Sequence, residues 1–475
     1  MTTPQPAFFN TLGRKLVPFE PIVPGEARLY TCGPTVYGHV HIGNLRTFLF
    51  EDVLRRALGY LGYRVTQVMN LTDVDDKTIE GANRAGVPLD DFTAPFIDSF
   101  FADLDTLHVE RAERYPRATE HVAEMIALIE RLLAAGVAYE KEGSVFFRIA
   151  ADADYGKLSG IDLDEVRQGE RVASDEYGKE DVRDFVLWKA AKPGEPTWDS
   201  PWGPGRPGWH VECSAMSMKY LGETFDIHSG GVDNVFPHHE NEIAQSESAT
   251  GRPLAHLWLH SEHLIVDGAK MSKSLGNQYV LADLLAKGVE PRALRYLFVS
   301  VHYRQKLNFT FPSLEAAANA LRRIDEMRFR LDHAAESGPP DAALTAAVER
   351  ATADFAAALA DDLNTAAALA AVFGLVREVN VAIEAERLGE GDRQRVLDAL
   401  AGFDRVLGVL DPAAWRRDAP APAGPTDEEI DSLVTARTEA RARRDWAEAD
   451  RLRDELAAAG VVLEDTPGGT RWKRG

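Results

Sequence analysis

The sequence predicts an α/β protein in which a parallel sheet covered by helices comes first and a helical bundle follows it. The stretch "EARLYTC" (Glu26 to Cys32) is typical of a strand, and "YRVTQVMNLTD" (Tyr63 to Asp73) is typical of a second one. Between them, apolar residues recur at steps of three and four, which indicates a helix. Strand, helix and strand in this order form a βαβ unit, the building block of a parallel sheet. The region from Ser313 to Leu410 is rich in Ala, Leu and Arg without a strand pattern, which predicts the bundle.

The helix between the two predicted strands is amphipathic. Its apolar positions are Leu45, Phe48, Leu49, Val53, Leu54 and Leu58. Gly59 and Gly62 end it before the second strand begins. A parallel sheet of this kind binds its ligands at the carboxyl ends of its strands.

We assign residues 1–115 and 201–312 to the sheet domain and residues 116–200 to an insertion. The insertion contains a helical stretch, "EHVAEMIALIERLLAAG", followed by polar, glycine-containing loops such as "EKEGSVFFRIAADADYGKLSG". Residues 313–410 form the bundle, with "TAAALAAVFGLVREVNVAIE" as its clearest helix. A linker rich in Pro and Ala, 411–426, leads to a small separate module, 427–475.

The composition is that of a soluble globular protein of several domains, because 475 residues exceed the size of a single core. The N-terminus has no apolar stretch of signal-peptide length, and the longest apolar run, Ala366 to Val376, is too short to span a membrane. We therefore expect a cytoplasmic protein without a membrane partner. The net charge of −22 argues against a nonspecific nucleic-acid coat, but it allows an RNA partner held by local basic patches.

The chain has two cysteines, Cys32 and Cys213. They could form a disulfide, which a reducing cytosol disfavours, or they could be unrelated buried side chains. Both lie beside stretches rich in His, Gly or Pro, which favours a metal site.

The short motif His41-Ile42-Gly43-Asn44 lies where the first strand gives way to the helix. Gly43 allows close backbone approach, and the helix N-terminus offers free N–H groups to a phosphate. His41, with His39 nearby, could donate to phosphoryl oxygens. The alternative is a solvent-facing loop in which the histidines have no role.

A second motif, "GAKMSKSLGN", runs from Gly268 to Asn277. Its Lys270 and Lys273 are mobile ammonium groups suited to a polyphosphate whose charge grows as a bond breaks. Alone, such a loop could be a solvated turn. Together with the His-Ile-Gly-Asn motif it resembles the class I aminoacyl-tRNA synthetases, whose Rossmann-type domain activates an amino acid with ATP.

A third motif, "DIHSGGVDNVFPHHENEIAQSE", places Pro237 at an expected first helical position. His238 and Glu242 would then share one helix face, while His239 would point about 100° away and be the poorer ligand. With the two cysteines, His238 and Glu242 make a two-sulfur, one-nitrogen, one-oxygen set suited to zinc. An exposed polar helix start is the alternative.

Five stretches spread over the chain resemble the cysteinyl-tRNA synthetase family: "YTCGPTVYGHVHIGNLRTF", "NLTDVDDKTI", "LWKAAKPGEPTWDSPWGPGRPGWHVECSAMS", "FDIHSGGVDNVFPHHENEIAQ" and "KMSKSLGN". The resemblance continues through "DDLNTAAALAAVF" to the C-terminal "ARRDWAEADRLRDELAAAGVVLEDTPGGTRWKR". It implies a Rossmann-type catalytic domain with a stem-contact region, a connective insertion and a C-terminal anticodon-binding module.

The resemblance also implies a role for each matching residue. The zinc ligands would be Cys32, Cys213, His238 and Glu242. The ATP-binding residues would be His41, Gly43, Asn44, Lys270, Ser272 and Lys273, with His41, Asn44, Lys270 and Lys273 acting in catalysis. The cysteine pocket would contain Thr72, Trp209, His228 and Asp233, with Asp233 facing the substrate ammonium group.

The implied reaction has two steps: cysteine attacks Mg²⁺-bound ATP to give cysteinyl-adenylate, and the terminal ribose of tRNA(Cys) then takes the cysteinyl group. Zinc would distinguish cysteine from serine, because pockets without a metal separate near-isosteres by only about 1–3 kcal/mol. A soft thiolate is a far better zinc ligand than a hydroxyl. We expect one zinc per chain and a monomer.

The C-terminal module contains a locally positive helix and ends in "TRWKRG", where Trp472 could stack on a base. A solvated amphipathic helix is the alternative to anticodon binding.

Three other functions are possible for the whole chain. A ligase that acylates an amino sugar would need neither the helical bundle nor the C-terminal module. A tRNA-binding protein with a dead catalytic domain would not need intact phosphate and zinc motifs, and an adenylyltransferase of cofactor synthesis is typically much shorter than this chain.

Overall fold

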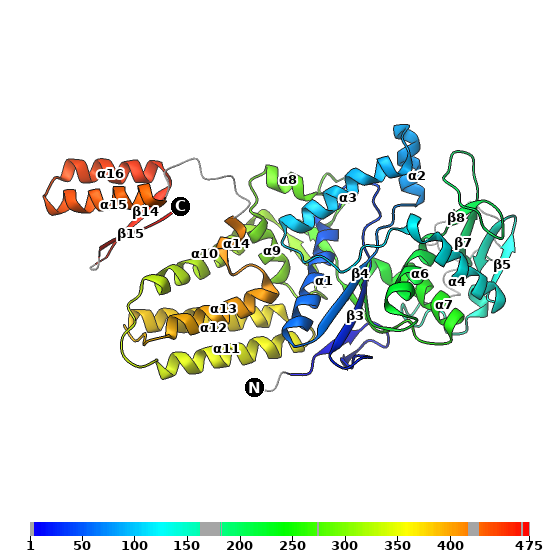
Figure 1. Cartoon of the computed structure of the whole chain (residues 1–475), viewed down its shortest axis with the longest axis horizontal. Helices are drawn as coiled ribbons and strands as arrows, with labels where there is room; N and C mark the ends of the chain where they lie inside the picture. Colours follow the sequence, from blue (N-terminus) through cyan, green and yellow to red (C-terminus); the bar gives the residue numbers. More distant parts are fainter. Residues whose placement is uncertain are drawn as a thin grey trace. The chain divides into compact units, whose positions relative to one another are not determined.

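A computed structural model describes residues 4–161, 181, 183–272, 275–416, 427–466 and 469–474 (Figure 1). The chain divides into two compact units, Met1–Asp411 and Pro412–Gly475. Each unit has its own core.

The first unit is built around a four-stranded parallel sheet with strand order β10-β9-β3-β4. The strands are β3 (Glu26–Thr31), β4 (Arg64–Met69), β9 (Phe225–Gly231) and β10 (Ala255–Ser261). Helix α1 (Ile42–Tyr60) connects β3 to β4, which confirms the predicted βαβ unit. All six apolar positions predicted for this helix are buried. An N-terminal hairpin of β1 (Ala7–Asn10) and β2 (Lys15–Pro18) packs on β10.

The segment between β4 and β9 holds helices and a second sheet. The helices are α2 (Asp76–Ala85), α3 (Leu89–Thr106), η1 (Ala118–His121), α4 (Val122–Ala134), η2 (Ile149–Ala151) and α6 (Trp209–Leu221). The sheet is antiparallel and consists of β5 (Ala138–Lys141), β6 (Ser144–Phe147), β7 (Phe185–Ala190) and β8 (Gly205–Pro207). The predicted helix in "EHVAEMIALIERLLAAG" is α4, but the prediction of loops directly after it was wrong. β5 and β6 form a hairpin there, because Val145, Phe146 and Phe147 are fully buried in a strand too short to show an alternating pattern.

The segment after β9 returns to the sheet and then leads into the bundle. It comprises η3 (Val232–Asn234), η4 (Val235–His239), α7 (Glu240–Thr250), α8 (Leu281–Ala286) and α9 (Pro291–Val299). A three-stranded sheet of order β12-β11-β13 consists of β11 (Leu264–Val266), β12 (Ala269–Lys270) and β13 (Leu307–Phe309).

Four helices form the predicted bundle: α10 (Phe311–His333), α11 (Ala342–Ala360), α12 (Thr365–Glu384) and α13 (Asp392–Leu407) (Figure 1). Helix α12 coincides with the stretch predicted to be the clearest helix. It is also the one described helix long and apolar enough to cross a membrane by length and composition, a test that core helices of soluble proteins also pass. Leu369, Val372, Val376 and Val379 of α12 are buried within the bundle.

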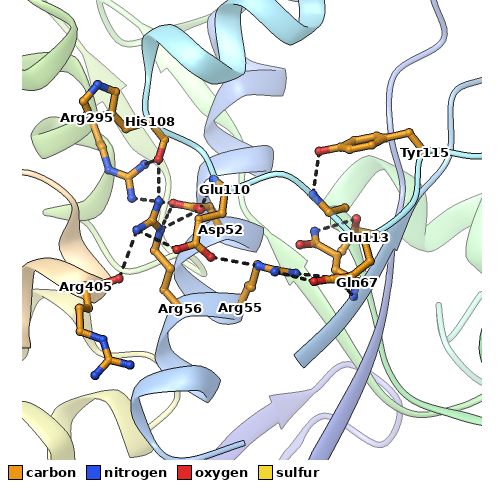
Figure 2. A network of polar contacts seen from close by, with 12 residues as sticks. Asp52, Arg55, Arg56, Gln67, His108, Glu110, Glu113, Tyr115, Arg295 and Arg405 are labelled. Carbon is orange, nitrogen blue, oxygen red and sulfur yellow. Dashed lines mark hydrogen bonds and ion pairs between the residues drawn. The ribbon is translucent and has the colours of Figure 1, made fainter. Parts of the chain in front are cut away.

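A buried polar network attaches the end of the bundle to α1 (Figure 2). Arg295 of α9 is fully buried and donates to Asp52 Oδ2 of α1 at 2.6 Å and to the Leu407 carbonyl of α13 at 2.8 Å. Arg56 donates to both oxygens of Asp52 at 2.8 Å. Gly408 ends α13 with φ of 64°, and a Cβ there would lie 2.9 Å from the Arg295 guanidinium. The last carbonyls of a helix have no N–H partner within it, and at the end of α13 they accept hydrogen bonds from Arg295 and Arg56 instead.

The second unit begins with α14 (Pro412–Arg416), so the first residues of the predicted linker are helical and residues 417–426 lie outside the described part of the chain. It continues with α15 (Asp427–Ala442), α16 (Trp446–Ala458) and a hairpin of β14 (Val461–Thr466) and β15 (Gly469–Arg474). Trp472, expected to offer a stacking plane for a base, is partly buried. Its ring packs on the core of this unit, and its Nε1 donates to Asp431 Oδ1 at 2.6 Å.

Candidate active site

A hollow of about 780 Å³ lies at the carboxyl ends of the four parallel strands. Its walls come from the segments that follow each strand: Cys32–His41 after β3, Asn70 and Thr72 after β4, Gly231–Asn234 after β9, and Ser261–His263 after β10. Ligands of open parallel sheets bind at this edge. Most of the residues predicted for the site meet here.

The four predicted metal ligands converge at one side of the hollow. The candidate donor atoms of Cys32, Cys213, His238 and Glu242 all lie within 4.8 Å of one another, and the four residues are buried. Cys32 follows β3, Cys213 is on α6, and the other two come from η4 and α7. Both cysteines are free thiols, so the disulfide alternative is excluded in this structure.

The helix predicted to start at Pro237 starts at Glu240 instead. Residues 235–239 form a wide turn, in which Phe236 is extended (φ −139°, ψ 132°). The turn still brings His238 Nε2 to 3.1 Å from Glu242 Oε1. It also places His239 inside the site, so the expectation that His239 points away from the ligand set was wrong.

His239 Nε2 lies 3.2 Å from Cys32 Sγ, and its Nδ1 lies 2.8 Å from His260 Nε2. Cys32, His228, His239 and Glu242 therefore form a second group whose donor atoms lie within 4.8 Å of one another. The two groups share Cys32 and Glu242 and differ in whether a second sulfur or a second imidazole takes part. A site with two sulfurs is the more typical of zinc.

Burial disfavours the charged form of every group in this cluster. It raises the pKa of Cys32 well above its ordinary value, raises that of Cys213, and raises the pKa of Glu242 to about 7. It lowers the pKa of His238. Oε1 of Glu242 makes no hydrogen bond among the described residues. A divalent cation would compensate the thiolates and the carboxylate together, so this donor set fits a zinc ion.

The His-Ile-Gly-Asn motif forms the N-terminus of α1 and lines the same hollow. His41 is the N-cap: its Nδ1 accepts the Asn44 backbone N–H at 3.2 Å, and Asn44 Oδ1 accepts the His41 N–H at 3.2 Å. Because Nδ1 is an acceptor, the ring proton is on Nε2, which leaves an N–H donor for a ligand. Burial lowers the pKa of His41, which keeps the ring neutral.

The two motifs predicted to bind ATP are in contact. A Cβ on Gly43 would lie 2.6 Å from Met271 Cε and 3.0 Å from His41 Nδ1, so a larger residue here would displace the Met271 side chain. Lys270 and Met271 line the hollow, and the Ser272 N–H donates to Asn277 Oδ1 at 2.9 Å. The predicted Lys273, with Ser274, lies outside the described residues.

Three of the four residues predicted for the cysteine pocket line the hollow: Thr72, Trp209 and Asp233. Trp209 is 40% exposed and stacks on His238, with ring centroids 4.4 Å apart. His228 differs, because it is fully buried behind Glu242, with its Nε2 2.9 Å from Glu242 Oε2. It contacts the metal cluster rather than the wall of the hollow.

Several residues around the site were not predicted. Glu212 Oε2 accepts from Thr72 Oγ1 at 3.0 Å, and Asn70 Nδ2 donates to the same hydroxyl at 3.1 Å, so the Thr72 side chain is fixed from both sides. Burial raises the pKa of Glu212 well above its ordinary value. Glu212 directly precedes Cys213, which could have drawn attention to it. Nothing in the sequence indicates that its side chain points inward.

Three family models match the chain: "tRNA synthetases class I (C) catalytic domain" over residues 18–319, "DALR domain" over 354–411, and "Cysteinyl-tRNA ligase anticodon binding domain" over 424–472. A cysteine–tRNA ligase of Solibacter usitatus is 49% identical over 467 residues, which cover 98% of this chain and 99% of that protein. One from Protochlamydia amoebophila is 46% identical over 472 residues, 98% of this chain and 97% of that protein.

Solved structures with a similar fold are more distant in sequence. Methionyl-tRNA synthetase of Mycobacterium tuberculosis in complex with methionyl-adenylate superposes with a TM-score of 0.60 at 18% identity, over 89% of this chain and 96% of that one. A leucyl enzyme of Agrobacterium radiobacter, in a ternary complex with tRNA, superposes with a TM-score of 0.58 at 13% identity, over 94% and 95% of the two chains.

Proposed function

The chain belongs to the cysteinyl-tRNA synthetase family and is a ligase that joins cysteine to its tRNA, and we propose how its own residues carry out that reaction. L-cysteine and Mg²⁺-bound ATP occupy the hollow together, with the cysteine side chain toward Cys32 and the phosphates toward the start of α1. The support is that a donor set suited to zinc and a helix N-terminus with a neutral histidine cap face the same hollow.

The zinc ligands in this proposal are Cys32, Cys213, His238 and Glu242. When bound, zinc supplies a soft cation that prefers the sulfur of cysteine to the oxygen of serine. His239 contacts Cys32 and His228 contacts Glu242 at hydrogen-bond distance, and His260 in turn contacts His239, as neighbours of metal ligands commonly do.

The first step needs no strong base, because the attacking cysteine carboxylate is already an anion. It attacks the α-phosphorus in line and the bond to pyrophosphate breaks, so orientation and charge stabilisation carry the step. We assign His41 Nε2–H, Asn44 and the N-terminus of α1 to ATP, and Lys270, Ser272 and Lys273 to the phosphates. Gly43 lets the helix approach the nucleotide closely.

The substrate cysteine is held at the other side of the hollow. Asp233 is largely exposed and can pair with the substrate ammonium group. The Thr72 hydroxyl is held by Glu212 and Asn70, and Trp209 can cover the amino acid from above His238. In the second step the terminal ribose of tRNA(Cys) takes the cysteinyl group from the adenylate.

For anticodon binding we propose the second unit, with residues 116–200 as the connective insertion and 313–410 as the bundle. Trp446 at the start of α16 is 59% exposed and directly follows Arg443, Arg444 and Asp445, so it is a second candidate stacking residue beside the partly buried Trp472. We expect the enzyme to act as a monomer in the cytoplasm.

The direct test is cysteine-dependent exchange of pyrophosphate into ATP, followed by charging of tRNA(Cys) with serine as competitor. We expect exchange with cysteine and none detectable with serine at equal concentration, and loss of both zinc and exchange in Cys213→Ala. Equal exchange with serine, or zinc-free protein that keeps full selectivity, would overturn the proposal.

A further inference from the structure

Arg46 is a buried cation in the second turn of α1, two residues after Asn44 and only 3% exposed. Its guanidinium donates to four backbone carbonyls. Nη1 donates to Glu262 O and His263 O, each at 2.7 Å, while Nη2 donates to Gln305 O and, at 3.4 Å, to His302 O. Within the described residues no carboxylate forms an ion pair with it. Burial lowers the pKa of Arg46 to about 10, so it remains charged at neutral pH.

The four carbonyls belong to the two connections from which the small sheet starts. Glu262 and His263 lead from β10 into β11, and His302 and Gln305 lead from α9 into β13. β11 pairs with β13 on one side and with β12, which ends at Lys270, on the other. Arg46 therefore binds the base of the sheet that carries the lysine motif.

The far end of the lysine segment is also attached to α1. The Ile42 N–H donates to Tyr279 O at 2.9 Å, and His41 pairs with Val280 in an isolated antiparallel bridge. The segment from Glu262 to Val280, which carries the lysine motif, is thus attached to the first two turns of α1 at both ends, to Arg46 at its start and to Ile42 at its end. The two ATP motifs, about 230 residues apart in the sequence, share one helix as their support.

We propose that Arg46 is a positioning residue for adenylate formation, which sets Lys270 and the loop after it at the correct distance from His41 and Asn44. This inference rests on the proposed function, in which Lys270 and His41 bind ATP. A guanidinium is needed because its planar fork reaches several acceptors at once, whereas a lysine ammonium is a single compact donor.

The test uses Arg46→Lys, Lys270→Ala and the double variant in the full chain, with cysteine-dependent pyrophosphate exchange as the assay. A misplacement of about 1 Å can cost roughly 10²-fold, so we expect Arg46→Lys to slow exchange by about 10–100-fold. The loss should appear in kcat and in KM for ATP, with KM for cysteine and zinc content unchanged. In the Arg46→Lys background, Lys270→Ala should slow exchange by less than about threefold more, because that lysine is already misplaced.

The matched control is Arg292→Lys. Arg292 donates to Val409 O at 2.8 Å and to both oxygens of Asp325, but it touches neither ATP motif, so exchange should stay within about twofold of wild type. If the penalties of Arg46→Lys and Lys270→Ala multiply, or if only thermal stability changes, the inference is wrong. Should Arg46→Lys fail to fold, Arg46→Gln is measured in the same way. A wild-type chain without cysteine-dependent exchange would overturn the proposed function itself.

Discussion

Replacing Asp52 by Asn should destabilise the first unit strongly although the two side chains have the same shape. Asp52 is fully buried and accepts from Arg295 at 2.6 Å, from Arg56 at 2.8 Å and from the Glu110 backbone N–H at 2.8 Å (Figure 2). An amide cannot neutralise Arg295, which is itself fully buried. In Asp52→Asn the remaining partners of Arg295 are the carbonyls of Leu107, His108 and Leu407, which carry no full charge.

The expected loss follows from leaving one buried charge without its partner, which costs about 3–5 kcal/mol in the free energy of unfolding. Asp325→Asn is the matched control, because Asp325 pairs with Arg292 through two hydrogen bonds but is 31% exposed. Solvent screens that pair, so its loss should be about 1 kcal/mol or less. Urea denaturation of the full-length variants measures both. An Asp52→Asn effect below about 1 kcal/mol, or no larger than that of Asp325→Asn, would refute the reasoning.

The ion pair between Asp52 and Arg295 also predicts at which pH the effect of Asp52→Asn changes. Burial alone would raise the pKa of Asp52, but Arg295 and Arg56 outweigh it and hold the pKa below its ordinary value. A carboxyl whose pKa is lowered by folding stabilises the protein above its unfolded pKa of about 3.9 and ceases to do so as the pH falls through the folded pKa. The difference between wild type and Asp52→Asn should therefore be constant from pH 6 to pH 8. A difference that shrinks within this range would show that another group is responsible.

Three further predictions concern the metal, the lysine loop and the second unit. Metal analysis of chelator-washed protein should give about one zinc per chain, reduced in His238→Ala more than in His239→Ala; the reverse order would assign the metal to the second ligand group. Lys273→Ala should slow pyrophosphate exchange by roughly 10²–10³-fold with normal zinc content, and normal exchange would make the loop structural. Cutting the chain after Ala421 should preserve exchange but weaken charging of tRNA and flatten its salt dependence, and full anticodon-selective charging by the truncated protein would refute the anticodon assignment.

Much of the fold follows from periodic patterns that the sequence displays directly. Helix α1 could be predicted because its buried positions repeat at helical spacing, and α12 because twenty residues rich in Ala, Leu and Val and without proline follow Asn364. The β5–β6 hairpin could not, because its strands have four residues each and β6 is buried on both faces. The partial burial of Trp472 could not be predicted either, because its partners Asp431 and Ile430 lie about forty residues earlier in the sequence.

The metal cluster could be predicted because it uses the two cysteines of the chain, and both lie in recognisable motifs. The four predicted ligands do converge in the structure. The position of His239 could not be predicted from helix periodicity, because its neighbours in the site, Cys32 and His260, come from other elements of the fold. Arg46 and Glu212 were missed because their partners are backbone carbonyls and a threonine hydroxyl, which leave no pattern in the sequence.

The histidine at the start of α1 also bears on how such a protein can evolve. Serine, aspartate and asparagine are the favoured residues at a helix N-cap, and His41 occupies that position instead. A substitution such as His41→Ser would be expected to keep or improve the helix while removing the Nε2–H donor that faces the hollow. With the ATP-binding role proposed for His41, selection for stability and selection for activity would oppose each other at this position. A screen for thermostable variants that does not also select for activity should then tolerate the loss of His41.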